Sequence, residues 1–407
     1  MAGPLTGIRV LDLSRILAGP WASQMLADLG AEVIKVERPG SGDDTRGWGP
    51  PYMPDADGNP TTESAYFHAA NRGKRSVCID ISVAAGQGLI RDLAAHSDVL
   101  IENFKVGGLR RYDLDYASLQ AVNPRLVYCS ITGFGQTGPY AARAGYDFMI
   151  QAMGGMMSVT GEPDGQPMKI GVALADLLTG MYAANAIQAA LIHQRATGQG
   201  QYIDLALLDV QVATLANQAM NYLASGVNPQ RLGNAHPNIV PYQAFQTSDG
   251  YIILAIGNDT QFERFCELAG RRELAADERF RKNSQRVKFR AELVPQVAAV
   301  MREKTSSDWL AALNARGIPC GPINDIAAVF DDPQVRAPAG CSWSLRIRLR
   351  ARLRASPIRS DYRRARSTMS AHHRSWGRIP PKCCNGFCNW TRRKLRGCAA
   401  NRPSPDR

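Results

Sequence analysis

The first forty residues alternate between short apolar runs and one amphipathic segment. Residues 8–13 are largely apolar and read as a strand, while residues 21–29 repeat apolar side chains with the 3.6-residue period of a helix. Gly30 ends that helix, and residues 32–36 form a second strand-like run before a Pro-Gly turn. The pattern predicts a strand–helix–strand unit at the start of the chain.

The same alternation continues to about residue 223. Strands are predicted at residues 75–81, 97–104, 126–132 and 201–206, and helices at residues 86–95, 176–194 and 208–223. This order favours an α/β fold in which a Rossmann-like sheet carries helices on both faces. A strand at residues 250–257 and helices between residues 259 and 313 follow a loop-rich passage. We therefore expect a large α/β domain over residues 1–225 and a smaller α+β domain over residues 226–330.

The net charge of +12 is concentrated in one segment. Residues 338–407 contain sixteen Arg, two Lys and two Asp, a net charge of +16, so residues 1–337 carry −4. A disordered basic tail that binds nucleic acid is one interpretation of this segment. The mildly acidic body does not favour a nucleic-acid partner.

Other composition features narrow the class of protein. No apolar stretch is long enough to span a bilayer, and the first residues lack a charged-then-apolar signal pattern. The scattered cysteines of the body fit buried thiols in a reducing compartment, so we expect a cytoplasmic protein without a membrane partner. The His and Cys cluster at residues 372–388 matches no standard zinc spacing, and no metal site is expected.

Residues 133–138 match the letters of a dinucleotide-binding glycine motif after a predicted strand. A dinucleotide site requires that this loop open a helix whose N-terminus faces the pyrophosphate. The residues that follow, including Pro139 and Gly145, show no helical periodicity. A flexible loop beside a site is the better interpretation.

Asp176 is the candidate catalytic residue. It follows an apolar run, residues 171–175, at the start of a predicted helix. One interpretation is a plain N-cap, because aspartate is a favoured acceptor for the first amides of a helix. The other is a nucleophile, since the helix dipole and amide hydrogen bonds would hold the carboxylate ionised in an apolar environment. Sequence alone leaves both open.

The motifs at residues 17–20 and 36–46, Leu-Ala-Gly-Pro and Val-Glu-Arg-Pro-Gly-x-Gly-Asp-Asp-Thr-Arg, resemble those of class III CoA-transferases, the family of formyl-CoA and carnitine-CoA transferases. The resemblance covers roughly residues 5–337. It implies an interlocked homodimer if the C-terminus is intact, with an acyl-CoA and a carboxylic acid as substrates. It also implies that Asp176 attacks the thioester, giving a mixed anhydride and then an aspartyl-CoA thioester. Coenzyme A enters as a substrate, and no prosthetic group is expected.

The resemblance also implies which residues contact the CoA. By position in the family pattern these are Ile16, Leu17, Arg38, Lys74, Asn103, Phe104 and Arg111. Arg38 and Arg111 would offer forked contacts to phosphate, and Lys74 would act as a point charge. Without the resemblance, each cation would read as a solvated surface base. Formyl-CoA transferases have Gln in place of Leu17, which disfavours oxalate or formate as substrate.

Two further segments bear on the reaction. Residues 42–51 and 236–245 look most like the succinyl-CoA–glutarate branch, which favours succinyl-CoA as donor and glutarate or a similar acid as acceptor. Tyr146, also expected near the CoA, stands where the related α-methylacyl-CoA racemases place His. Because the reference pKa of Tyr is about 10, two-base proton exchange at neutral pH is poorly served. The racemase reaction is the alternative function.

The segment from about residue 338 reads like an out-of-frame translation. When the last base of each codon is joined to the first two bases of the next, residues 376–391 permit a capped amphipathic helix. That helix resembles the family's C-terminal Leu-Gly-Glu-His-Thr-x-Glu-Val-Leu, and residues 355–363 permit a second family-like segment in the same frame. We therefore interpret residues 338–407 as a frameshift product and assign them no function. An inactive frameshifted transferase is the third alternative.

Overall fold

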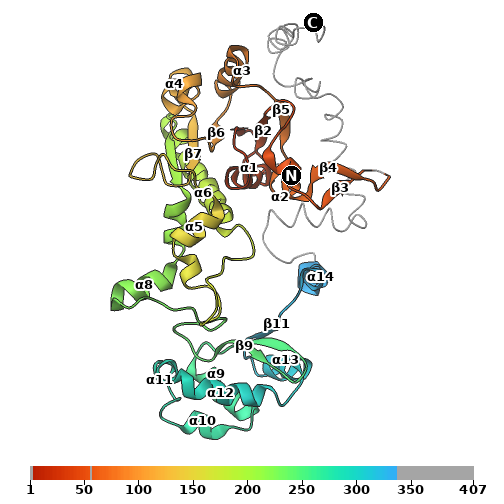
Figure 1. The fold of residues 1–407 in the computed structure, drawn as a ribbon, viewed down its shortest axis with the longest axis vertical. Helices are drawn as coiled ribbons and strands as arrows, with labels where there is room; N and C mark the ends of the chain where they lie inside the picture. Colours follow the sequence, from red (N-terminus) through yellow and green to blue (C-terminus); the bar gives the residue numbers. More distant parts are fainter. Residues whose placement is uncertain (1–2, 56, 337–407) are drawn as a thin grey trace. The chain divides into compact units, whose positions relative to one another are not determined.

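The computed structural model describes residues 3–55 and 57–336, which form two compact units (Figure 1). The first unit comprises the described residues up to Gly155 together with Ile170–Ala216. The second comprises Met156–Lys169 and the described residues from Asn217 onward. The division therefore falls before the predicted boundary at residue 225, and a short internal segment joins the second unit. The predicted tail of residues 338–407 lies outside the described residues.

The first unit is built on a six-stranded parallel sheet, as the sequence pattern predicted. In spatial order its strands are β5 (Arg75–Cys78), β2 (Glu32–Glu37), β1 (Arg9–Asp12), β6 (Val99–Glu102), β7 (Val127–Thr132) and β8 (Tyr202–Ala206). The chain runs from β1 to one side of the sheet and later returns to its other side at β6. The junction between β1 and β6 is therefore the topological switch point, where open parallel sheets bind ligands at the carboxyl ends of the strands.

Helices cover both faces of this sheet. They are α1 (Ala18–Asp28), α2 (Ala65–Asn71), α3 (Ala84–Ala94), α4 (Tyr116–Val122), α5 (Asp147–Met153), α6 (Leu174–Thr197) and α7 (Leu207–Ala213). Short 3₁₀ helices η1 (Asp44–Gly47) and η2 (Arg110–Tyr112) and a hairpin of β3 (Tyr52–Pro54) and β4 (Pro60–Ser64) complete the unit.

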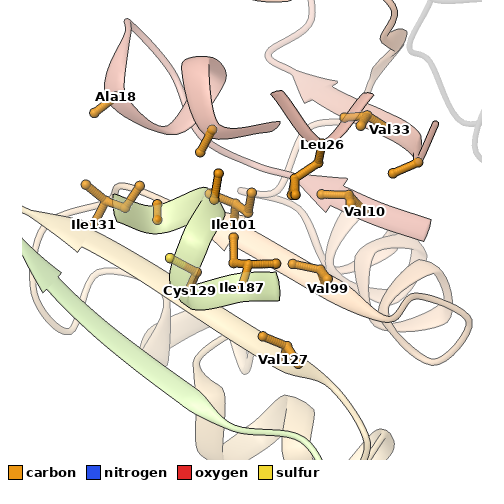
Figure 2. Close-up of a cluster of buried hydrophobic side chains, with 14 of the residues drawn as sticks. Val10, Ala18, Leu26, Val33, Val99, Ile101, Val127, Cys129, Ile131 and Ile187 are labelled. Carbon is orange, nitrogen blue, oxygen red and sulfur yellow. The ribbon is translucent and has the colours of Figure 1, made fainter. Parts of the chain in front are cut away.

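Successive strand residues point into two separate cores. Val10 packs with residues of α1 and α6, whereas Leu11 packs with residues of α3 and α4. Figure 2 shows the first core, in which Leu26 of α1 lies near Val10 of β1 and Ile187 of α6 lies near Val99 of β6. Because both faces are covered, the strands read in sequence as continuous apolar runs, which made them recognisable.

The predicted helix at residues 208–223 is two helices. α7 ends at Ala213 and α8 (Ala216–Ser225) begins three residues later. Ala216 has a φ of +48°, in the left-handed region, so the helical path does not continue through it. The apolar period runs on across this break, which is why the sequence pattern did not reveal it.

The second unit contains a three-stranded antiparallel sheet in the order β11 (Cys320–Pro322), β10 (Tyr251–Ala255), β9 (Tyr242–Gln246). Its helices beyond α8 are α9 (Asp259–Leu268), α10 (Arg272–Ala276), α11 (Asn283–Lys288), α12 (Arg290–Met301), α13 (Ser306–Ala315), α14 (Ile326–Asp331) and α15 (Pro333–Arg336); the 3₁₀ helix η3 (Met156–Ser158) precedes them. Ile252, Phe265 and Trp309 lie in its separate apolar core. An antiparallel sheet with helices matches the α+β prediction.

Within the described ranges, no helix combines the length and apolar character needed to cross a membrane. The cytoplasmic location stays a prediction.

Candidate functional site

Asp176 lies in the first turn of α6, two residues after the helix begins at Leu174. The helix has Ala173 at its N-cap, without a side-chain cap, so Asp176 is not the N-cap residue. The amides of Ala175 and Asp176 both donate to Oδ1 of Asp147, at 2.8 and 3.3 Å. The cap of α6 is therefore supplied by α5, and the N-cap interpretation of Asp176 is wrong.

The electrostatics of Asp176 differ from what the sequence predicted. Burial raises its pKa to about 7, and the negative charge of Asp147 adds to this effect. Within the described part of the chain, no hydrogen-bond donor and no cation reaches the Asp176 carboxylate. The expectation that the dipole and the amides hold this group ionised is corrected, because Asp147 accepts those amides.

Gly180 allows one face of α6 to pack closely against α1. A Cβ at Gly180 would lie 2.8 Å from the carbonyl oxygen of Ala18, so only glycine permits α6 to approach the start of α1 this closely. Residues four apart share one helix face, so Asp176 projects on the same side as Gly180. The carboxylate therefore faces the region where α1 begins.

The turn between β1 and α1 is held in a strained conformation. Ile16 has a φ of +70°, which is costly for a β-branched residue. Asn103 fixes the backbone of Arg15, the residue before Ile16. Its Oδ1 accepts from the Arg15 amide at 2.9 Å, and its Nδ2 donates to the Arg15 carbonyl at 2.7 Å. The Asp43 carboxylate accepts from the Ile16 amide at 3.3 Å. Leu17 packs inside the unit with 6% exposure, whereas Ile16 stays half-buried.

Phe104 follows β6 at the same edge of the sheet and is half-buried. Its amide donates to Oε2 of Glu102 at 2.7 Å. Burial raises the pKa of Glu102 to about 7, although the bonds from Ser130 and Phe104 act in the opposite direction. Glu102 thus orients the backbone of Phe104, one of the residues implied to contact CoA. The sequence did not single out this carboxylate.

Lys74 does not occupy the exposed position that we expected. Its ammonium donates to Asp12 Oδ2 at 3.1 Å, to the Pro20 carbonyl at 2.8 Å and to Asn71 Oδ1 at 2.8 Å. These acceptors use all three protons, and the side chain is 2% exposed. Burial lowers the pKa of Lys74 to about 8, while Asp12 opposes that shift. Lys74 therefore stabilises the junction of β1 and α1, and the prediction that it contacts a phosphate is corrected.

The remaining predicted residues are at the surface. Arg38 directly follows β2 and is exposed. Arg111 is exposed in η2, with its guanidinium carbon 4.5 Å from the centroid of the Tyr112 ring. Tyr146 is 66% exposed and immediately precedes α5. Arg38 follows a strand at the carboxyl edge of the sheet, as a phosphate-binding cation would.

Tyr66 in α2 is a site residue that the sequence analysis missed. Burial raises its pKa, and the charges of Asp176 and Asp147 raise it further. Its ring packs edge-to-face against Trp48, with centroids 5.3 Å apart. No motif marks this tyrosine, because only the packing of α2 within the first unit brings it near Asp176.

The glycine loop after β7 does not open a helix. β7 ends at Thr132, and the next helix of the unit, α5, begins at Asp147. A pyrophosphate-binding helix N-terminus therefore does not follow this motif, in agreement with the sequence interpretation. Nor do the described residues contain a group of three or more side chains placed to bind a metal ion.

Comparisons with known proteins decide the family. The model of CoA-transferase family III matches residues 5–369. The chain is 58% identical over 334 residues to a succinate–glutarate CoA-transferase of Agrobacterium fabrum, covering 82% of this chain and 83% of that protein. It is 47% identical over 332 residues to the succinyl-CoA:glutarate CoA-transferase of Mus musculus, covering 82% and 74%. A crystal structure of a CAIB/BAIF family protein from Brucella suis superposes with a TM-score of 0.74 at 57% identity, covering 83% and 89% of the two chains.

The chain belongs to CoA-transferase family III. The resemblance inferred from the sequence motifs is thereby confirmed, as are the α/β fold and the assignment as a CoA-transferase. The family match continues to residue 369, into the segment that we interpreted as out of frame. That interpretation concerns residues outside the described part of this CoA-transferase, and it stays a prediction.

Proposed function

We propose that the chain transfers CoA from succinyl-CoA, or a similar acyl-CoA, to glutarate or a similar carboxylic acid, with Asp176 as the nucleophile. The observation that carries the proposal is the half-buried Asp176 carboxylate, which no cation of the described residues neutralises. A carboxylate with a pKa near 7 is more basic, and hence more nucleophilic, than an ordinary aspartate. The names of the relatives from Agrobacterium fabrum and Mus musculus support the choice of substrates.

The proposed reaction proceeds through four acyl exchanges. The Asp176 carboxylate attacks the thioester carbonyl, the C–S bond breaks, and CoA leaves as thiolate while a mixed anhydride forms. The thiolate attacks the Asp176 carbonyl of the anhydride, which releases the donor acid and leaves an aspartyl-CoA thioester. The acceptor carboxylate attacks this thioester and again displaces the thiolate. Thiolate attack on the acceptor carbonyl then forms the new acyl-CoA and restores Asp176.

The strand edge provides the surface for the CoA in this proposal. Ile16, Arg38, Asn103 and Phe104 follow the carboxyl ends of β1, β2 and β6, and Arg111 follows them in η2. Arg38 and Arg111 are exposed and would supply the phosphate contacts, since a guanidinium forms forked bonds to phosphate. Tyr146 is exposed and would lie along the acyl part of the substrate.

We also propose that the enzyme is a homodimer if its C-terminus is intact. α6 presents three large apolar side chains to solvent, Met181, Tyr182 and Ile192, of which Ile192 is 70% exposed. Apolar surface on a long helix is typical of a face covered by another chain. Light scattering on the purified protein should give twice the chain mass of 44.3 kDa, and a monomer at micromolar concentration would refute the dimer.

The transfer proposal is tested by acceptor-dependent exchange. We expect the purified full chain to convert succinyl-CoA and glutarate to glutaryl-CoA, and Asp176→Asn to reduce the rate by at least about a thousandfold. Asp209→Asn is the matched control, because Asp209 is an exposed first-turn aspartate of α7. Activity retained in Asp176→Asn would refute the proposal, as would deuterium exchange at the α-carbon of an acyl-CoA without any acceptor-dependent transfer.

A further inference from the structure

Two aspartates meet at the N-terminus of α6. Asp147 is the first residue of α5, and its Oδ1 accepts the amides of Ala175 and Asp176 at 2.8 and 3.3 Å. The amide of Leu174 donates to the carbonyl of Val172 at 2.9 Å. The first three amides of the helix therefore all have acceptors other than the Asp176 side chain.

Asp147 is itself held by a buried glutamine one turn along α5. Gln151 is 0% exposed, and its Nε2 donates to Oδ2 of Asp147 at 2.8 Å. The Oε1 of Gln151 accepts from the amide of Ile170 at 2.9 Å, and its Nε2 lies 3.4 Å from the carbonyl of Val172. Gln151 thus binds the backbone of the segment that leads into α6, and Asp147 binds the backbone of the first turn of α6.

This arrangement has an electrostatic consequence for the nucleophile. An acidic residue in the first helical turn is ordinarily stabilised by the helix dipole and by free amides. Here a second carboxylate occupies the amides, so Asp176 receives burial and like-charge repulsion instead. The groups that face Asp176 are the carboxylate of Asp147 from α5 and the phenol of Tyr66 from α2. Burial and the repulsion from the Asp147 charge both raise the pKa of Asp176.

We propose that Asp147 is the positioning residue of the nucleophile, because it caps α6 in place of Asp176 and leaves the Asp176 carboxylate unpaired in the site. The inference rests on the proposed role of Asp176. It assigns Asp147 no contact with the substrate. Its action is to fix the first turn of α6 and to keep the neighbouring carboxylate basic, which raises the nucleophilicity toward the thioester.

The test reads the titration of Asp176 directly, without requiring activity. The full chain is labelled with ¹³C at aspartate carboxyl carbons, and the Asp176 signal is assigned by its absence in Asp176→Asn. In the unsubstituted protein we expect a midpoint near pH 7. Asp147→Asn and Asp147→Ser keep an acceptor for the amides but remove the charge, and each should lower the midpoint by about one pH unit.

Gln151→Ala is the matched control, because it removes the bond to Asp147 and the clamp on Ile170 but leaves the charge of Asp147 in place. It should shift the midpoint by less than about a third of the change seen with the neutral variants. A midpoint near 4 in the unsubstituted protein would overturn the inference. An unchanged midpoint in both neutral variants would do the same, even if transfer activity is present. Absent transfer activity with the expected midpoints would refute the proposed function alone.

Discussion

The first unit buries carboxylates in two regions with opposite electrical surroundings. Between β1 and α1, burial alone would raise the pKa of Asp12, but Lys74, Lys35 and two serine hydroxyls outweigh it and lower the value to about 2. The same balance holds at the end of β2, where the bonds and charge of Arg46 overcome burial and lower the pKa of Glu37 to about 2. These carboxylates have partners at 2.7 to 3.1 Å.

At the start of α6 no partner of the described residues offsets the effect of burial on the carboxylate pKa. Asp176 is half-buried beside another carboxylate, and its pKa rises to about 7. Glu102 at the end of β6 is also raised to about 7, although two hydrogen bonds partly offset burial.

The difference separates carboxylates that stabilise the fold from carboxylates whose raised pKa suits the proposed reaction. Paired carboxylates such as Asp12 stabilise the native state at neutral pH, since they are ionised and matched. An unpaired carboxylate such as Asp176 destabilises the native state when it is ionised, because that state must then carry a partly buried, unmatched charge. Groups of this second kind concentrate at functional sites, where the raised pKa is useful.

Removing the Lys74 ammonium from the region between β1 and α1 should have the largest effect on stability. Lys74→Met leaves Asp12 buried without its nearest charge, and we expect the free energy of unfolding to fall by about 3 to 5 kcal/mol at pH 7. Arg75→Met is the matched control, because its ion pair with Glu32 is largely exposed and should cost less than about 1 kcal/mol. Urea unfolding measures both, and equal costs would remove the distinction between the regions.

Neutralising the unpaired Asp176 carboxylate should raise the free energy of unfolding instead of lowering it. The pKa of Asp176 rises from 3.8 to about 7 on folding, so its stabilising proton is fully bound below about pH 4 and is lost as pH rises through 7. Asp176→Asn should therefore stabilise the fold by about 2 to 4 kcal/mol at pH 8, with a smaller gain at pH 5. Asp209→Asn should change stability little at either pH. A destabilised Asp176→Asn at pH 8 would contradict the account.

Glu102→Gln should behave like Asp176→Asn but more weakly. The pKa of Glu102 rises from 4.5 to about 7, so ionised Glu102 also costs stability above neutral pH. Gln keeps an acceptor for the Phe104 amide, and we expect a gain of about 1 to 2 kcal/mol at pH 8 that declines toward pH 5. Thermal unfolding across this pH range measures it. A loss at every pH would place Glu102 with the paired group.

The sequence predicted the fold better than it predicted the partners of the charged side chains. The parallel strands were recognisable because burial on both faces makes them apolar throughout, as at residues 99–102. The break before Ala216 was not, because a single left-handed residue leaves the apolar period unchanged. The position of Asp176 at a helix start was also predicted from the pattern alone.

The partners of charged groups could not be predicted, since they lie far apart in sequence. Lys74 belongs to a basic motif that reads as surface, yet its partner Asp12 is 62 residues away. Asp147 and the amide of Asp176 are separated by 29 residues. No local pattern encodes either contact, so the cap of α6 and the buried lysine emerged only from the folded structure.

Trapping the covalent intermediate tests the central claim most directly. Hydroxylamine converts an aspartyl-CoA thioester to a hydroxamate with release of CoA, and peptide mass spectrometry locates the modified residue. We predict that the protein incubated with succinyl-CoA forms a hydroxamate at Asp176, and that hydroxylamine without acyl-CoA forms none. Efficient CoA transfer with an unmodified Asp176, or with the hydroxamate at another carboxylate, would contradict the account.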